Sequence, residues 1–129
     1  MSAVSLARVR VLNRTKGTVV ASCAEVADSF GNRLVGLLGR RSLAPGGGLW
    51  LVPGNSIHTL GMRFPIDVVL LNREQAVVDV RKSVRPWSFV WPNFHARSIL
   101  ELPTGTIWAT RTEPRDLLQI EVLDSPNRN

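Results

Sequence analysis

Two carboxylates lie inside apolar, strand-like segments, and their surroundings make them the first candidates for chemistry. Asp67 interrupts the run 64–71, which is otherwise apolar on both faces of a strand, and Glu101 interrupts the apolar run 99–102. A desolvated carboxylate costs on the order of several kcal/mol unless it accepts hydrogen bonds or pairs with a cation. We therefore predict that at least one Arg or His nitrogen lies within hydrogen-bonding distance of the Asp67 carboxylate.

The candidate partners of these acids flank the same segments of sequence. His58 and Arg63 precede the apolar run, and Arg40 and Arg41 lie in the loop that leads toward it. One interpretation is structural: Arg side chains or backbone N–H groups pin both acids near strand ends. The other is a pocket for an unknown small polar or anionic ligand, such as a sugar, and our leading hypothesis is a non-enzymatic binding module that uses these residues. The predicted ligand-binding set is Arg40, His58, Arg63, Asp67 and Glu101.

Catalysis and metal binding have weaker support in the sequence. His58 with Asp67 orienting it would suit a general base, so a hydrolase or lyase is a third hypothesis, and whether the protein is an enzyme stays open. The chain has two histidines and one cysteine, without a recognised ligand spacing, so we expect no metal and no cofactor. Cys23 alone allows no intrachain disulfide, and nothing in the sequence requires an oxidising compartment.

An aromatic segment offers a different chemistry. Trp87, Phe89 and Trp91 are spaced two apart, so an extended chain would present all three on one side as a stacking platform for bases or sugar rings. Arg85 and Arg97 flank this segment and could hold phosphates. The alternative, which we favour, is that these aromatic side chains close the end of the fold as a hydrophobic plug.

The charge suggests a second hypothesis, that the protein binds single-stranded nucleic acid. We do not favour this hypothesis. The formal charge is +6, and residues 1–64 hold eight basic and two acidic residues, whereas the remainder is balanced. Trp87 and Trp91 would then stack on bases beside this basic half. No basic tail accompanies the excess, and a compositional habit of the source genome would also produce the dominance of Arg over Lys.

Short apolar runs separated by Gly and Pro favour many short strands. The pattern predicts hairpins formed by 7–12 with 19–26 and by 66–71 with 76–80, further strands at 99–102, 106–110 and 117–123, and one helix at 28–38. The expected fold is mainly β (α+β): a compact, barrel-like curled sheet of about seven or eight short strands with one short helix packed on it. We expect one domain over 1–129, with a core at 8–122 and short flexible termini.

Composition excludes several classes of protein. With 44% apolar and 20% charged residues, the 129-residue chain is typical of a globular domain and not of a disordered, collagen-like or coiled-coil protein. No segment approaches about 18 uninterrupted apolar residues, so we expect no membrane span. The first seventeen residues lack the apolar stretch of a signal peptide, and a cytoplasmic location is expected.

Three segments, GLLGR at 36–40, IHTLGMRFPIDVV at 57–69 and LELPTG at 100–105, resemble the prokaryotic family named domain of unknown function 192. The resemblance extends over about residues 8–122 and implies a small β-rich, barrel-like fold with one helix, but no catalytic set. Pro65, Asp67, Glu101 and Gly105 match the family pattern. The chain departs from it at 58–62, where many relatives carry Trp-Met-Lys-Asn-Thr, and at Arg115, where relatives commonly have Gly before the acid.

Overall fold

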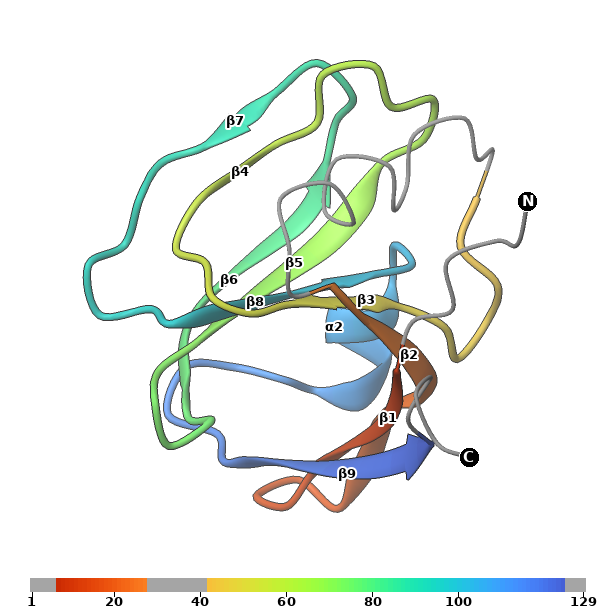
Figure 1. Cartoon of the computed structure of the whole chain (residues 1–129), viewed down its shortest axis with the longest axis vertical. Helices are drawn as coiled ribbons and strands as arrows, with labels where there is room; N and C mark the ends of the chain where they lie inside the picture. Colours follow the sequence, from red (N-terminus) through yellow and green to blue (C-terminus); the bar gives the residue numbers. More distant parts are fainter. Residues whose placement is uncertain (1–6, 28–41, 125–129) are drawn as a thin grey trace.

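The computed structural model describes residues 7–27 and 42–124, and within them the protein is mainly β, as predicted (Figure 1). The helix predicted at 28–38 and the candidate Arg40 lie outside the described residues. In the part that is described, no helix is long and apolar enough to cross a membrane. The elements are β1 (Arg8–Asn13), β2 (Thr18–Ala27), β3 (Leu49–Leu51), β4 (Ile57–His58), β5 (Ile66–Leu71), β6 (Val77–Val84), β7 (Phe89–Val90), β8 (Ser98–Leu102), α2 (Thr106–Thr110) and β9 (Leu118–Asp124).

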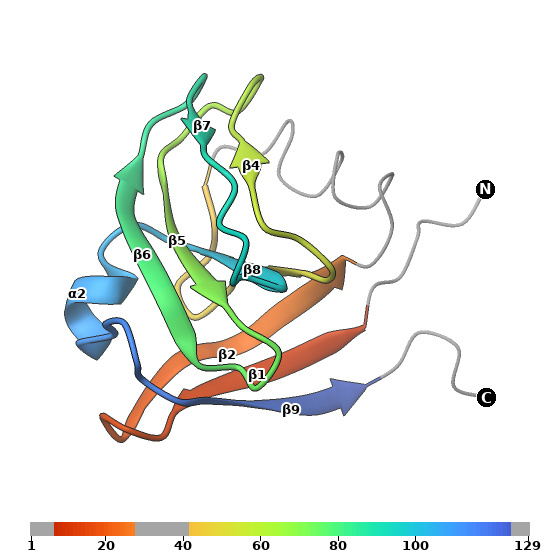
Figure 2. The same cartoon turned by 90° about the vertical axis from the view of Figure 1, so that its left-hand side faces the viewer.

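Seven of these strands form one sheet in the order β6-β5-β8-β3-β2-β1-β9. Both predicted hairpins are present, because β1 pairs antiparallel with β2 and β5 pairs antiparallel with β6. The β2–β3 pair is parallel. Figure 2 shows the sheet bending between the β5–β6 hairpin and the strands β1, β2 and β9.

The sheet is curled, but it is not closed into a barrel. Its edge strands β6 and β9 approach each other at one end only, through an isolated bridge between Ala76 and Leu117. Two backbone hydrogen bonds extend this contact, from the Val77 N–H to the Asp116 carbonyl and from the Arg115 N–H to the Val77 carbonyl. The predicted barrel-like shape is therefore only partly right.

The middle of the sheet is covered on both faces. Every residue of β5 and β8 is buried, which explains why the sequence of β5 is apolar without alternation. One face of these strands packs against Ile57 and Val90 of the short strands β4 and β7. The other packs inside the curl of the sheet, against Ile107 of α2 and the apolar side chains of β1 and β9.

Residues 106–110 form the short helix α2, so the strand predicted there is wrong. The segment Thr-Ile-Trp-Ala-Thr alternates and is rich in β-branched residues, which is typical of a strand. The helix is favoured by its ends: Gly105 at the N-cap and Arg111 at the C-cap both have left-handed backbone angles. An N–H group of its first turn also donates a hydrogen bond to a side chain that is distant in the sequence. Local propensity cannot reveal such a contact.

Strands β4 and β7 form a separate two-stranded sheet, here called the ribbon, which sequence analysis did not predict. Ile57 pairs with Val90 and His58 pairs with Phe89. The first pair is buried and the second is exposed, so the ribbon follows the inward and outward alternation of a half-buried strand. With two residues per strand and more than thirty residues between partners, the pairing leaves no local signal in the sequence.

Arg115→Gly is expected to stabilise the protein by about 0.5–1 kcal/mol. Arg115 is exposed and has a φ of 80°, a left-handed angle at which glycine has no steric penalty. Urea unfolding would measure the gain. Arg73→Gly is the matched control, because Arg73 is an exposed turn residue without a positive φ, and this change should lower stability; a loss of stability in Arg115→Gly would contradict the prediction.

Candidate ligand-binding site

Asp67 is buried, as the sequence predicts, but its partners are backbone groups. One carboxylate oxygen, Oδ1, accepts a hydrogen bond from the Ser83 N–H at 2.9 Å, and Oδ2 accepts one from the Ile107 N–H at 2.9 Å. Within the part of the chain that the structure describes, no Arg or His side chain hydrogen-bonds to Asp67. The prediction of a cationic partner is therefore wrong for these residues, and backbone N–H groups hold Asp67, as the structural interpretation allowed.

The two donors reach Asp67 because of local irregularities in the fold. The pairing of β5 with β6 shifts register between Ile66 and Val68, so β6 carries an extra residue opposite Asp67. Ser83 lies in this bulge with a φ of 51°. Ile107 is the second residue of α2, where a helix N–H has no partner within the helix. Asp67 thus fastens the β6 bulge and the start of α2 to the central strand.

Glu101 lies on the opposite face of the sheet from Asp67. In the antiparallel pairs, Asp67 is opposite Leu102, whereas Glu101 is opposite Val68 on one side and Leu49 on the other. Directly paired residues share a face, and neighbours along a strand alternate, so the two acids point away from each other. Glu101 is buried and has an interaction partner of its own. The structure does not bring the two carboxylates to one pocket.

The other described members of the predicted set, His58 and Arg63, do not hydrogen-bond to Asp67. His58 is exposed on β4, and its Nδ1 accepts a hydrogen bond from the Leu60 N–H at 3.3 Å. Arg63 is exposed in the segment after β4. Because both Asp67 oxygens are bonded to backbone groups, Asp67 does not orient His58 as the hydrolase or lyase hypothesis expects. Among the described residues, no group of three or more His, Cys, Asp or Glu side chains is placed to hold a metal.

The aromatic segment lies on the surface, so its prediction as a buried plug is wrong. Trp87 is 71% exposed, Trp91 78% and Phe94 81%, and Phe89 is also exposed. Phe89 and Trp91 contact each other edge to face, with ring centroids 5.3 Å apart and an interplanar angle of 78°. We call these four side chains the aromatic ridge. A concentration of exposed rings on this scale is typical of a binding surface.

Thr59 holds the start of this ridge in place. This buried residue donates its hydroxyl hydrogen to the Arg85 carbonyl at 2.6 Å and accepts a hydrogen bond from the Ser88 N–H at 2.8 Å. Its backbone carbonyl accepts from the Trp87 N–H, and its N–H donates to the Ser88 carbonyl, each at 2.9 Å. Four hydrogen bonds therefore fix the turn at 85–88, and the exposed Trp87 extends from a rigid backbone.

A hollow of about 350 Å³ adjoins the other end of the ridge. Its backbone is joined to the ridge segment, because the Asn93 N–H donates to the Asn55 carbonyl at 3.0 Å and the Gly54 N–H donates to the Arg97 carbonyl at 2.9 Å. The Arg97 guanidinium donates from Nη1 to the Phe94 and Ala96 carbonyls. Among the described residues, no acceptor contacts Nη2 or Nε. The hollow is lined by Pro53, Gly54, Asn55, Ser56, Ala96 and Arg97.

The segments that build the ribbon carry positive charge only. Residues 52–65 and 82–97 contain four basic residues, two histidines and no acid. The basic residues are Arg63, Lys82, Arg85 and Arg97, and all four are exposed. Figure 2 shows β4 and β7 together at one end of the molecule, away from β1, β2 and β9. Rings, an arginine-lined hollow and unopposed cations therefore occur together, and this end is the candidate binding site.

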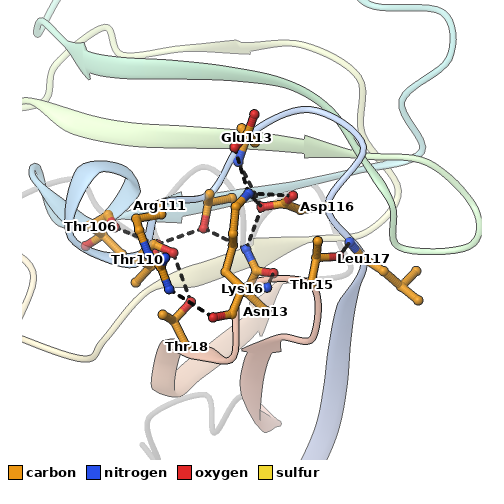
Figure 3. A network of polar contacts seen from close by, with 11 residues as sticks. Asn13, Thr15, Lys16, Thr18, Thr106, Thr110, Arg111, Glu113, Asp116 and Leu117 are labelled. Carbon is orange, nitrogen blue, oxygen red and sulfur yellow. Dashed lines mark hydrogen bonds and ion pairs between the residues drawn. The ribbon is translucent and has the colours of Figure 1, made fainter.

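A second polar cluster was missed by sequence analysis and is structural (Figure 3). The buried Asp116 carboxylate accepts hydrogen bonds from the Asn13 side chain at 2.9 Å, from Lys16 Nζ at 2.8 Å and from the Glu113 N–H at 3.1 Å. The Asn13 side chain also donates to the Thr112 hydroxyl. These bonds join the β1–β2 turn, the end of α2 and the loop before β9.

Hydrogen bonding decides the charge state of this cluster. Burial raises the pKa of Asp116, but the hydrogen bonds from Asn13 and Lys16 outweigh it, so the pKa lies below the ordinary value of an aspartate. The carboxylates of Asp116 and Glu113 in turn raise the pKa of Lys16. Asp116 is therefore ionised and fully bonded, which suits a structural ion pair and leaves it without a free site for a substrate.

Some of these residues had signals in the sequence. Asp116 matches the acid that the family pattern places before the last strand, and Asn13 begins a turn whose residue Gly17 has a φ of 71°. The hollow residues Asn55 and Ser56 lack such a signal, because they become neighbours of Arg97 only through the ribbon. Arg97 itself was identified in the sequence only as a flank of the aromatic segment.

Comparisons with known proteins identify relatives without an assigned role. The model of the DUF192 family, described as uncharacterised, matches residues 11–120. A UPF0127 protein of Pyrococcus furiosus is 35% identical over 114 residues, covering 84% of this chain and 96% of that protein. A UPF0127 protein of Thermococcus sibiricus is 33% identical over 120 residues, covering 87% of this chain and 75% of that protein.

Solved structures share the fold at low sequence identity. A protein described as a proposed transcription regulator from Sinorhizobium meliloti has a TM-score of 0.79 at 23% identity, covering 92% of this chain and 98% of that one. A protein of unknown function from Novosphingobium aromaticivorans has a TM-score of 0.76 at 18% identity, covering 92% and 88%. At these identities the likeness extends to the fold alone.

Proposed function

The chain belongs to the DUF192 family of uncharacterised proteins, and we propose that it is a binding module, not an enzyme, that holds a small anionic ligand at the ribbon. The observation that carries this proposal is the hollow beside Arg97, in segments that hold four cations and no acid. The ligand class is the polar or anionic one expected from the sequence, whereas the residues differ: Arg97, Asn55 and Ser56 replace the buried acids.

The dimensions and chemistry of the hollow support a small ligand. Its volume of about 350 Å³ lies at the lower end of the range for ligand sites, about 300–1,000 Å³. Nη1 of Arg97 is held by two backbone carbonyls, so the guanidinium plane is fixed before a ligand arrives. A fixed guanidinium suits phosphate or carboxylate, which it can contact through two parallel N–H groups. Phe94 next to it supplies a ring face for a sugar or base.

Isothermal titration with a nucleoside 5′-monophosphate and a sugar phosphate tests this proposal. We expect at least one of them to bind, and Arg97→Gln to weaken that binding about tenfold or more, because a charged hydrogen bond to the ligand is lost. Arg73→Gln, an exposed arginine in the β5–β6 turn, is the matched control and should bind like wild type. Absence of binding by both compounds, or equal losses in the two variants, would refute the proposal.

A further inference from the structure

We propose that the ribbon takes single-stranded nucleic acid, with the aromatic ridge stacking on successive bases and the flanking cations contacting phosphates. This inference rests on the proposed function, since it names the larger ligand whose phosphate-bearing end the hollow would hold. The inference is based on the aromatic ridge. The ridge adjoins the hollow, and a small ligand bound in the hollow would leave its exposed rings without a contact.

The exposed rings of the protein are concentrated in the ribbon segments. Five of the ten large apolar side chains exposed in the described part of the chain come from the ribbon segments. Four of them are the rings of the ridge, held within eight residues of sequence, and Leu60 is the fifth. Stacking of a base on an aromatic side chain contributes about 1–3 kcal/mol and tolerates any sequence, because every base has a flat face. A row of fixed rings therefore suits a ligand with a repeated flat group.

Ring geometry favours a single strand over a duplex. The Phe89 and Trp91 ring centroids are 5.3 Å apart and the two planes are inclined by 78°. Consecutive bases in a duplex strand are parallel and rise only about 3.4 Å. Rings at this angle cannot both stack on parallel bases, so they suit the unstacked bases of a single strand, the state in which single strands are bound on aromatic side chains. His58, paired with Phe89 across the ribbon, adds a further ring on the same face.

Charge distinguishes nucleic acid from other partners that stack on aromatic rings. A neutral carbohydrate would not pair with the positive charges of Arg63, Lys82, Arg85 and Arg97. A basic partner would find no acidic residue in these segments to pair with. An anionic lipid surface would use the same rings and cations. The hollow at the end of the ridge places Asn55 and Ser56 beside Arg97, and these polar groups favour a ligand that forms directed hydrogen bonds.

Fluorescence anisotropy with a labelled 12-nucleotide single strand tests the inference, with the same sequence as a duplex and a mononucleotide competitor beside it. We expect the single strand to bind at least tenfold more tightly than the mononucleotide and than the duplex. With two to four phosphate contacts, the logarithm of affinity should fall against the logarithm of salt concentration with a slope of about −1.4 to −2.8. The same measurement with anionic vesicles as a competitor tests the alternative, that these rings and cations bind an anionic lipid surface.

Matched tryptophan variants locate the binding. Trp87→Ala and Trp91→Ala should each weaken single-strand binding about fivefold to a hundredfold, the range expected for one lost base stack. Trp108→Ala should leave it unchanged, because Trp108 is as exposed as these residues (77%) but lies on α2, away from the ribbon in both views. Lys82→Gln should reduce the salt slope by about 0.7. Melting temperatures check that each variant is folded.

The possible results separate the two proposals. If the mononucleotide binds and the strand binds no more tightly, the single-strand inference is overturned and the small-ligand proposal stands. If neither binds, both fall. Binding to anionic vesicles without binding to the strand, equal affinity for strand and duplex, or an equal loss in Trp108→Ala would each overturn the inference.

Discussion

Asp67→Asn is expected to lower the free energy of unfolding by about 3–5 kcal/mol. The side-chain amide keeps one acceptor oxygen, but its NH2 group would face the second backbone donor, either the Ser83 or the Ile107 N–H. A charged acceptor is thereby lost and a buried donor is left without a partner. Urea unfolding would measure the change, and the melting temperature should fall by roughly 10–20 °C.

Asp124→Asn is the matched control for this substitution. Asp124 pairs with Arg8 at the surface, where an ion pair contributes little to stability. The two variants remove the same charge from the same residue type. The difference between their losses in the free energy of unfolding therefore measures the contribution of burial and hydrogen bonding at Asp67. A stability loss in Asp67→Asn no larger than that in Asp124→Asn would contradict the role of Asp67 as the fastener of α2 and the β6 bulge.

Asp116→Asn should destabilise the protein by about 2–4 kcal/mol at neutral pH and change how stability depends on acid. The pKa of Asp116 is lowered in the folded protein, so the unfolded chain binds the proton more tightly. The stabilisation is therefore complete above the ordinary aspartate pKa of about 3.9 and is lost as the pH falls through the lower pKa of the folded state. The variant lacks this carboxylate and should lose less stability between neutral pH and about pH 3.

Unfolding free energies of wild type and Asp116→Asn, measured from pH 7 to about pH 3, test this expectation. The difference between the two proteins should be largest at neutral pH and should shrink on acidification. Asp124 serves again as the comparison, because its pairing with Arg8 also lowers its pKa but at an exposed site. A difference between wild type and Asp116→Asn that stays constant over the whole pH range would show that Asp116 stabilises the fold by some means other than its charge.

Patterns confined to one segment predicted much of the fold. The buried strand at 66–71 and its hairpin were identified because two apolar runs joined by a short polar turn are typical of a buried hairpin. The helix at 106–110 was missed because its stability depends on Asp67, forty residues away, and on left-handed caps. The ribbon was missed for a similar reason, since β4 and β7 are far apart in the sequence and the whole β5–β6 hairpin lies between them.

The candidate site was harder to predict, although its ingredients were visible. Burial of Asp67 and Glu101 followed from the sequence, but their partners and their opposite faces depend on strand register. A register shift of one residue moves every side chain of a strand to the opposite face. The apolar residues on both sides of each acid do not specify the register. Trp87 and Trp91 were identified, yet the position of Trp87 depends on the Thr59 hydrogen bonds that support the turn at 85–88.

We place binding on the ribbon and its hollow, and we assign the buried carboxylates a structural role only. An amide and indole NMR titration of the full chain with a single-stranded oligonucleotide tests this most directly. We expect shifts at the Trp87 and Trp91 indoles and at the amides of Asn55, Ser56 and Arg97, with the Trp108 indole unmoved. Shifts centred on β1 and β9, or a spectrum that does not change, would contradict it.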